Sequence, residues 1–316
     1  MKEEIKENIL VVGGSGFLGS EILNKCVDNF NLISISRFKP IGKDIIWIPT
    51  GDLFTIKGKN KIINLKPDKI IYTTFIAHQK YKKSKSFQKE ARNINYKLLK
   101  IVIDIALKIN CQKFIYISTA GIYGNSSLSG KPITENSRIS PESQYANMKL
   151  KCEKILIKKL SGSKVNYTIL RPCLIYGKNI KGNLFLLKNL IDIGLPLPFK
   201  YENNKRSFLG LNNFVCLIQE CLINSSANNE IFLVSDIEQT SLYSLVSMIT
   251  SVRFKDNKFF NFPIFILFFL KRIFYLKKYY YHLYSDLVID SSYVRYKLSW
   301  HQPRSQLIGF LESFFF

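Results

Sequence analysis

The sequence predicts an α/β protein with a doubly wound parallel sheet, and three observations support this fold class. Short continuous apolar runs, typical of strands buried on both faces, alternate with longer segments of helical periodicity. The first apolar run, at 8–14, leads directly into the glycine-rich stretch GGSGFLG and then into a helical pattern. With 316 residues, 47% of them hydrophobic, the chain can form one large domain or two interdependent ones around a substantial core.

Strands and helices are expected in regular alternation up to Pro172. The expected strands lie at 8–14, 31–37, within 44–53, at 68–75 and at 165–172, and a further strand begins the stretch 112–124 and runs into a loop. The expected helices lie at 17–28, 93–110 and 143–160. Ligands of such sheets bind at the carboxyl ends of the strands, so the loops that follow the strands are the candidate site.

The glycine-rich stretch fits two dinucleotide-binding spacings, Gly14-x-Gly16-x-x-Gly19 and Gly13-x-x-Gly16-x-x-Gly19. In both, the glycines permit a tight turn and a close approach of a pyrophosphate to the backbone, and the helix N-terminus supplies N–H groups. A tight turn without a ligand is the alternative, but the position between a strand and a helix favours the cofactor. We expect Gly13, Gly16, Phe17 and Gly19 to contact it.

After Pro172 the rhythm of the sequence changes and the loops lengthen, as in GLPLPFKYENNKRSF. We therefore expect residues 1–172 to form a dinucleotide-binding Rossmann domain. Residues 173–316 are expected to form mainly a smaller substrate-binding lobe, from which some segments return to the sheet.

A candidate acid/base pair lies on the expected helix 143–160. Tyr145 and Lys149 are four residues apart and so share a helix face. A neighbouring ammonium lowers the pKa of a phenol, which can then exchange a proton with a sugar hydroxyl while a hydride moves to or from a nicotinamide. Ser118 and Thr119, at the end of the fifth strand, can hold the same substrate oxygen. The alternative is an ordinary surface pair, because YxxxK is common by chance.

These motifs resemble those of the extended short-chain dehydrogenases, in particular the sugar-nucleotide epimerase/dehydratase family, over nearly the whole chain. The matching stretches are GGSGFLG, GDL at 51–53, NIN at 93–95, ISTAGIYG, YANMK, LRPCLIYG, KRSFLGLNNFV and YKLSWHQP. One departure is YTTF at 72–75, where the family commonly has small apolar residues beside the nicotinamide.

The resemblance implies a role for each matching residue. Thr119 would orient the substrate, Tyr145 would be the acid/base, and Lys149 would bind the nicotinamide ribose and depress the tyrosine pKa. Asp52 and Leu53 would flank the adenine of the cofactor. Asn183 and Arg206 would bind the diphosphate of the substrate, and Ser118 would also bind the substrate.

The resemblance also narrows the reaction. Sugar-nucleotide 4,6-dehydratases carry an acidic pair directly after the catalytic threonine, whereas this chain has Ala120 and Gly121, which cannot transfer a proton. Two reactions at C4 of a nucleotide-activated sugar remain, both found in polysaccharide synthesis. One is a 4-ketoreductase of a UDP-N-acetylhexosamine type of sugar, and the other is a 4-epimerase of the UDP-glucose or UDP-N-acetylglucosamine type. A dinucleotide-binding scaffold without catalysis is a third possibility.

The end of the second strand bears on the choice of cofactor. An acidic residue there would bind both ribose hydroxyls of NAD, but this chain has Ser36 and Arg37. Arg37 can pair with a 2′-phosphate, so among NAD(P) cofactors we expect a preference for NADP(H). Alternatively, Arg37 points to solvent and an NAD preference persists through Ser36 and Asp52. A cofactor replaced at each turnover suits a reductase, which favours the 4-ketoreductase over the epimerase.

The formal net charge of +23 admits nucleic acid, a membrane surface or anionic substrates as partners. The lysines are scattered along the chain, and no nucleic-acid-binding module is visible, so nucleic acid is not expected. The six cysteines form no CxxC pair and have no metal-ligand spacing with the histidines. The start, MKEEIKEN, has no apolar h-region. We therefore expect free thiols, no metal and a cytoplasmic location.

Two further expectations concern association. The apolar segment 259–282 is too short in its uninterrupted core to span a bilayer, which takes roughly 20 residues. We expect it to be a buried helix; a helix lying on the membrane surface is the alternative. The family resemblance implies a homodimer that packs through the helices near 93–110 and 143–160.

Overall fold

A computed structural model describes residues 6–42, 44–75, 85–127, 131–180, 183–200, 203–253, 259–260 and 285–315, with the backbone only at 85–93 and 183. The chain forms two compact units. The first comprises Met1–Thr119, Ser143–Arg171 and Leu217–Phe232, and the second Ala120–Glu142, Pro172–Cys216 and Leu233–Phe316.

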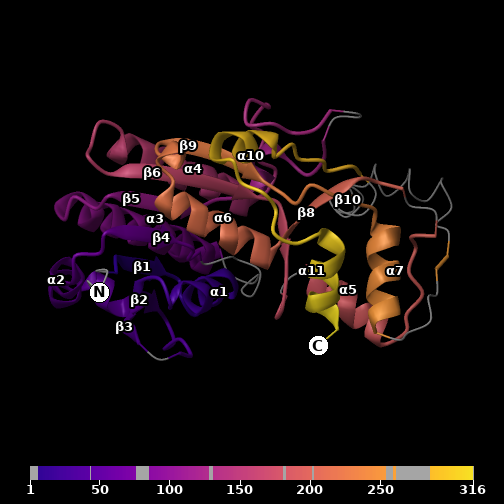
Figure 1. Ribbon diagram of the computed structural model, residues 1–316, viewed down its shortest axis with the longest axis horizontal. Helices are drawn as coiled ribbons and strands as arrows, with labels where there is room; N and C mark the ends of the chain where they lie inside the picture. The colour runs from indigo at the N-terminus through magenta and orange to yellow at the C-terminus, as the bar shows by residue number, and fades with distance from the viewer. Residues whose placement is uncertain are drawn as a thin grey trace, which may run out of the picture. The chain divides into compact units, whose positions relative to one another are not determined.

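The first unit contains a seven-stranded sheet with the strand order β3-β2-β1-β4-β5-β6-β9 (Figure 1). The pairs formed by β1 to β6 are parallel, as expected for buried apolar strands. The strands are β1 (Asn8–Val12), β2 (Asn31–Ser36), β3 (Ile45–Pro49), β4 (Lys69–Tyr72), β5 (Lys113–Ile117), β6 (Asn166–Pro172) and β9 (Glu230–Val234). This order confirms the doubly wound α/β class.

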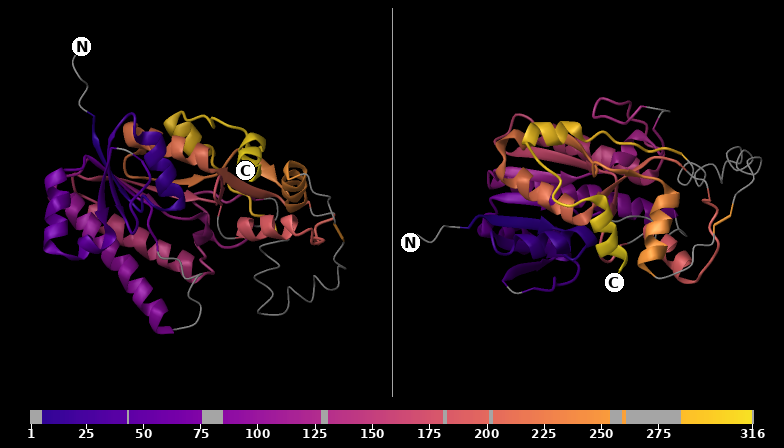
Figure 2. Two further views of the ribbon diagram at one scale, coloured as in Figure 1. Left: turned by 90° about the horizontal axis from the view of Figure 1, so that it is seen from below. Right: turned by 45° about the vertical axis from the view of Figure 1, so that its right-hand side comes forward.

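Helices cover both faces of this sheet. On one face α2, α3 and α4 lie side by side, and on the other lie α1 and α6, where Gln219 donates to the carbonyl of Lys25 at 3.0 Å (Figure 2). The helices are α1 (Phe17–Cys26), α2 (Ile56–Leu65), α3 (Lys85–Lys108), α4 (Gln144–Leu160) and α6 (Leu211–Ile223). Helix α3 begins earlier than the expected residue 93, because the preceding stretch is rich in helix-forming Lys, Gln, Glu and Ala without an apolar repeat.

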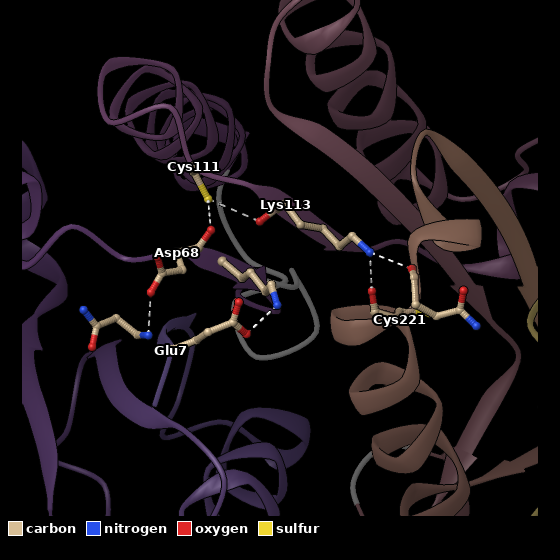
Figure 3. A network of polar contacts seen from close by, with 8 residues as sticks. Glu7, Asp68, Cys111, Lys113 and Cys221 are labelled. Carbon is tan, nitrogen blue, oxygen red and sulfur yellow. Dashed lines mark hydrogen bonds and ion pairs between the residues drawn. The ribbon is translucent and has the colours of Figure 1, made fainter. Parts of the chain in front are cut away.

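Two buried lysines form hydrogen bonds at the amino-terminal ends of the central strands β4 and β5 (Figure 3). Lys69 and Lys113 are paired across β4 and β5. Lys69 bonds to Glu7, and the Lys113 ammonium donates to the carbonyls of Cys221 and Asn224 at 2.8 and 2.9 Å. Because these carbonyls belong to the end of α6 and the turn after it, Lys113 ties that helix to the sheet. This network lies at the edge of the sheet opposite the carboxyl ends of the strands.

The second unit is built around a three-stranded sheet of order β10-β8-β7. In its hydrophobic core, Tyr176 and Phe208 of this sheet pack with Leu245, Phe310 and other buried apolar residues. Its elements are the 3-10 helix η3 (Ala120–Tyr123), β7 (Leu174–Tyr176), α5 (Asn183–Asp192), β8 (Arg206–Gly210), β10 (Gln239–Thr240), α7 (Leu242–Val252), α10 (Ser292–Leu298) and α11 (Gln306–Phe314).

The division of the chain differs from the expected boundary at 172 in one stretch. Residues Ala120–Glu142 belong to the second unit, because Ile133 exchanges backbone hydrogen bonds with Val288 and Asp290. Such long-range pairing leaves no local signal in the sequence. In the other direction, Leu217–Phe232 belongs to the first unit and supplies most of β9.

The apolar segment 259–282 lies outside the described residues except for Phe259 and Phe260. Within the described part of the chain, no helix combines the length and apolar character that crossing a bilayer requires.

Candidate active site

The loop between β1 and α1 needs glycine at several positions for its own packing, among them Gly13 and Gly19. Gly13 has a φ of +103°, and a Cβ there would lie 2.5 Å from the Thr73 hydroxyl oxygen. A Cβ on Gly19 would lie 2.2 Å from the Gly13 carbonyl oxygen. A side chain at either position would force the loop apart from the strand or the helix.

Gly16 differs from Gly13 and Gly19, because the packing of the loop requires a glycine less strongly at this position. Its backbone is extended, with φ −83° and ψ 171°, and a Cβ would meet only the Gly13 carbonyl oxygen, at 3.1 Å. Gly16 caps α1 without a side-chain hydrogen bond, and the first turn, which begins at Phe17, has no acidic residue. The N-terminus of α1 therefore offers its N–H groups and positive dipole end to an anion, and the loop fits the pyrophosphate of a dinucleotide.

The carboxyl end of β2 carries no carboxylate. The Ser36 hydroxyl is buried and donates to the Phe38 carbonyl at 2.7 Å. Arg37 is exposed, and its guanidinium lies 5.9 Å from the centre of the Phe38 ring. In the 3-10 helix η1 (Thr50–Phe54), Asp52 is half-buried, whereas the Leu53 side chain is fully buried in the core. Leu53 can therefore reach an adenine only through its backbone.

Tyr145 and Lys149 lie in the first turns of α4. The helix begins after Ser143, whose hydroxyl accepts a hydrogen bond from the Ala146 N–H at 3.0 Å. Tyr145 is 37% exposed, whereas Lys149 is 2% exposed and donates its ammonium to the Ile117 carbonyl at 2.6 Å. This bond fixes the lysine at the carboxyl end of β5, where the sheet of this fold class binds its ligands.

The electrostatics of the pair differ from the expectation. Burial lowers the pKa of Lys149 to about 8 and raises the pKa of Tyr145 to about 12. The ammonium lies 6.0 Å from the centre of the Tyr145 ring and is directed to the Ile117 carbonyl. The lowering of the phenol pKa by Lys149 is therefore not seen in this arrangement, and the phenol is protonated at neutral pH.

Ser118 points into the protein. Its hydroxyl is buried and donates to Glu153 of α4. Arg171 of β6 holds the same carboxylate with two donors, Nε at 3.1 Å and Nη2 at 2.7 Å. The predicted contact of the Ser118 hydroxyl with a substrate oxygen does not fit this placement, and the half-buried Thr119 is left as the candidate for that contact.

The predicted residue Ser118 is thus joined to two residues that were not predicted at the site, Glu153 and Arg171. Glu153 follows Lys149 by four residues and shares its helix face, which is the signal that could have indicated it. A charge-assisted, two-donor pair in the interior fixes α4 against β5 and β6. It therefore sets where the Tyr145–Lys149 pair lies relative to the sheet.

Replacing Glu153 by glutamine is expected to lower the free energy of unfolding by about 3–5 kcal/mol, because Arg171 would keep a buried charge without its partner. The matched control is Asp104→Asn, which removes an ion pair with Lys159 at the surface and should change stability by about 1 kcal/mol or less. Urea unfolding followed by circular dichroism measures both. Equal losses in the two variants would contradict the assignment of Glu153 as a buried anchor.

The residues expected at the substrate diphosphate belong to the second unit. Arg206 is 8% exposed and donates from Nη1 to the Ser285 carbonyl at 2.7 Å. Burial lowers its pKa to about 10, so it stays charged at neutral pH. Asn183 is the first residue of α5, and its side chain is outside the described part. Ala120 and Gly121 begin η3 and offer no carboxyl group.

The parallel sheet, the phosphate-fitting loop after β1 and the tyrosine–lysine pair on α4 together define a nucleotide-binding α/β fold of the short-chain dehydrogenase type. The chain belongs to the NAD dependent epimerase/dehydratase family, whose model matches residues 9–195.

Individual relatives agree with this membership. A UDP-glucose 4-epimerase of Vibrio cholerae is 28% identical, over 98% of this chain and 95% of the relative. A dTDP-4-dehydro-6-deoxyglucose reductase of Escherichia coli is 25% identical, over 80% and 83%. Among solved structures, a UDP-glucuronic acid 4-epimerase from Bacillus cereus, in complex with UDP-glucuronic acid and NAD, superimposes with a TM-score of 0.77 at 20% identity, covering 98% of both chains. This last likeness concerns the fold.

Proposed function

We propose that this protein carries out oxidoreduction at C4 of a nucleotide-activated sugar with an NAD(P) cofactor. The observation that carries the proposal is the Tyr145–Lys149 pair, fixed at the carboxyl end of β5 by the bond from Lys149 to the Ile117 carbonyl. In a family of epimerases and dehydratases, a proton-transferring phenol at this edge is the group that such chemistry needs.

In this proposal, different residues of the chain bind the cofactor, transfer the proton and bind the substrate. Gly13, Gly16, Phe17 and Gly19 hold the pyrophosphate at the start of α1, and Asp52 with the Leu53 backbone lies at the adenine. A nicotinamide bound there supplies the hydride acceptor or donor. Tyr145 moves the proton at the C4 oxygen, Thr119 orients that oxygen, and Lys149 binds the nicotinamide ribose. In the second unit, Asn183 and Arg206 bind the diphosphate of the sugar nucleotide.

A 4-epimerase is the first candidate reaction. It oxidises C4, turns the keto sugar over and reduces it from the other face with the same cofactor. Support comes from the Vibrio cholerae UDP-glucose 4-epimerase, which aligns over nearly the whole chain. A UDP-sugar, including a UDP-N-acetylhexosamine for polysaccharide synthesis, is then the proposed substrate.

A 4-ketoreductase is the second candidate, and one specific observation favours it. The end of β2 presents an exposed Arg37 and no carboxylate, which suits the 2′-phosphate of NADP(H). A reductase exchanges its cofactor at each turnover, and a relative at 25% identity is a reductase of a 4-dehydro sugar.

Cofactor content and turnover separate the two candidates. For a 4-epimerase, we expect the purified protein to release NAD on denaturation at near-full occupancy and to interconvert UDP-N-acetylglucosamine and UDP-N-acetylgalactosamine without added cofactor. For a 4-ketoreductase, we expect little retained NAD, tighter binding of NADPH than of NADH, and NADPH consumption with a 4-keto-6-deoxy sugar nucleotide. The control is Arg37→Gln, which in the second case weakens NADPH binding by about tenfold or more and leaves NADH binding unchanged. Dinucleotide binding with no turnover of either sugar would contradict both candidates and favour a scaffold.

We further infer, from the family resemblance alone, a homodimer that packs through α3 and α4. A cytoplasmic location and a weak peripheral contact with membranes likewise stay predictions.

A further inference from the structure

Three aromatic rings surround the ammonium of Lys149. The nitrogen lies 4.6 Å from the ring centre of Phe75, 5.0 Å from that of Tyr116 and 6.0 Å from that of Tyr145. Phe75 follows β4 closely, Tyr116 lies in β5 and Tyr145 lies on α4. Three separate elements therefore bring an aromatic side chain to one buried charge.

Phe75 contacts both members of the acid/base pair. Besides its position under the Lys149 ammonium, its ring meets the Tyr145 ring in a T-shaped contact, with centroids 5.2 Å apart and planes at 87°. Such contacts orient aromatic rings, because the negative face of one ring attracts the positive edge of the other. The same negative face attracts a cation, most strongly where water is excluded.

We propose that Phe75 is a positioning residue of the acid/base pair, which holds the buried Lys149 ammonium in its charged form over its ring and fixes the direction of the Tyr145 phenol. Removing the aromatic face, with apolar bulk retained, should therefore make the lysine lose its proton more easily. The expected effect of this substitution on catalysis rests on the proposed function, whereas the expected effect on the protonation of Lys149 does not.

The charged and titratable neighbours on α4 do not replace Phe75 in this role. Glu153 faces Lys149 and favours its charged form, but its carboxylate is already paired with Arg171 of β6 and bonded to Ser118. Burial raises the pKa of the Cys152 thiol, so Cys152 is neutral near pH 8.

The neighbours from the strands are also uncharged. Burial raises the pKa of Tyr116 and of Tyr72, whose rings lie 5.9 Å apart on β5 and β4. Among the residues that the structure describes, and apart from the paired Glu153, the Lys149 ammonium thus faces neutral rings, the neutral Cys152 thiol and the Ile117 carbonyl. Phe75 is the nearest of these rings.

The test is a direct titration of Lys149 in the full chain, without added cofactor. Carbon-13 NMR of the lysine ε-carbons follows each lysine with pH, and Lys149→Met identifies the signal by its disappearance. In the wild type this signal should titrate near the Lys149 pKa of about 8. In Phe75→Leu we expect the midpoint to fall by about half a unit to one unit. Phe75→Tyr, which keeps the aromatic face, should restore the wild-type midpoint.

An unchanged midpoint in Phe75→Leu would overturn the inference, as would an equal fall in Phe75→Tyr, which would point to packing alone. Thermal unfolding establishes that both variants are folded. If the proposed function holds, the alkaline limb of kcat/KM should shift downwards in Phe75→Leu by the same amount as the lysine midpoint. A shifted lysine midpoint in a protein that turns over no sugar nucleotide would contradict the proposed function and leave the role of Phe75 standing.

Discussion

Replacing Tyr145 by phenylalanine is expected to lower turnover of a sugar nucleotide by about a hundredfold to ten-thousandfold, with dinucleotide affinity nearly unchanged. The range is what a positioned acid/base group contributes in enzymes. The substitution removes the hydroxyl that moves the proton and keeps the ring that packs in a T-shaped contact with Phe75 at 5.2 Å.

Steady-state kinetics with the substrate that the wild type accepts measure the effect, and a dinucleotide titration measures the affinity. The matched control is Tyr296→Phe on α10, where the side chain is 86% exposed, which should leave both quantities unchanged. If Tyr145→Phe keeps wild-type turnover, the assignment of the acid/base is wrong.

Replacing Gly16 by valine is expected to abolish micromolar dinucleotide binding with the fold intact. The backbone at Gly16 is extended, and a Cβ there meets only the Gly13 carbonyl oxygen at 3.1 Å, so the folded loop can accept a side chain with a small adjustment. The branched side chain would fill the space in which a pyrophosphate approaches the loop and the start of α1.

Isothermal titration with NAD and NADP measures the binding, and thermal unfolding measures the fold. The comparison is Gly19→Ala, whose Cβ would lie 2.2 Å from the Gly13 carbonyl oxygen. That variant should lose thermal stability as well as binding, because the loop and helix must separate. Retained micromolar affinity in Gly16→Val would show that the loop is only a tight turn.

The sequence by itself determined the fold class and the position of its main motifs. The strands β1, β2, β4, β5 and β6 lie within the apolar runs that predicted them, because strands buried on both faces need continuous apolar side chains. The loop around Gly13 and the pair on one face of α4 follow from spacing alone. These signals are local, since each depends on residues a few positions apart.

The tertiary structure alone decided where the side chains at the site point. Ser118 and Thr119 are neighbours in the sequence, yet the Ser118 hydroxyl is taken up by Glu153, which Arg171 holds from another strand. Likewise, nothing in the segment around Phe75 indicates that its ring lies against Lys149, 74 positions further along the chain by residue number. The course of Ala120–Glu142 into the second unit depends on backbone bonds to residues near 289. Burial and long-range contact set these features, and because a buried charge must find its partners wherever the fold brings them, no local pattern encodes them.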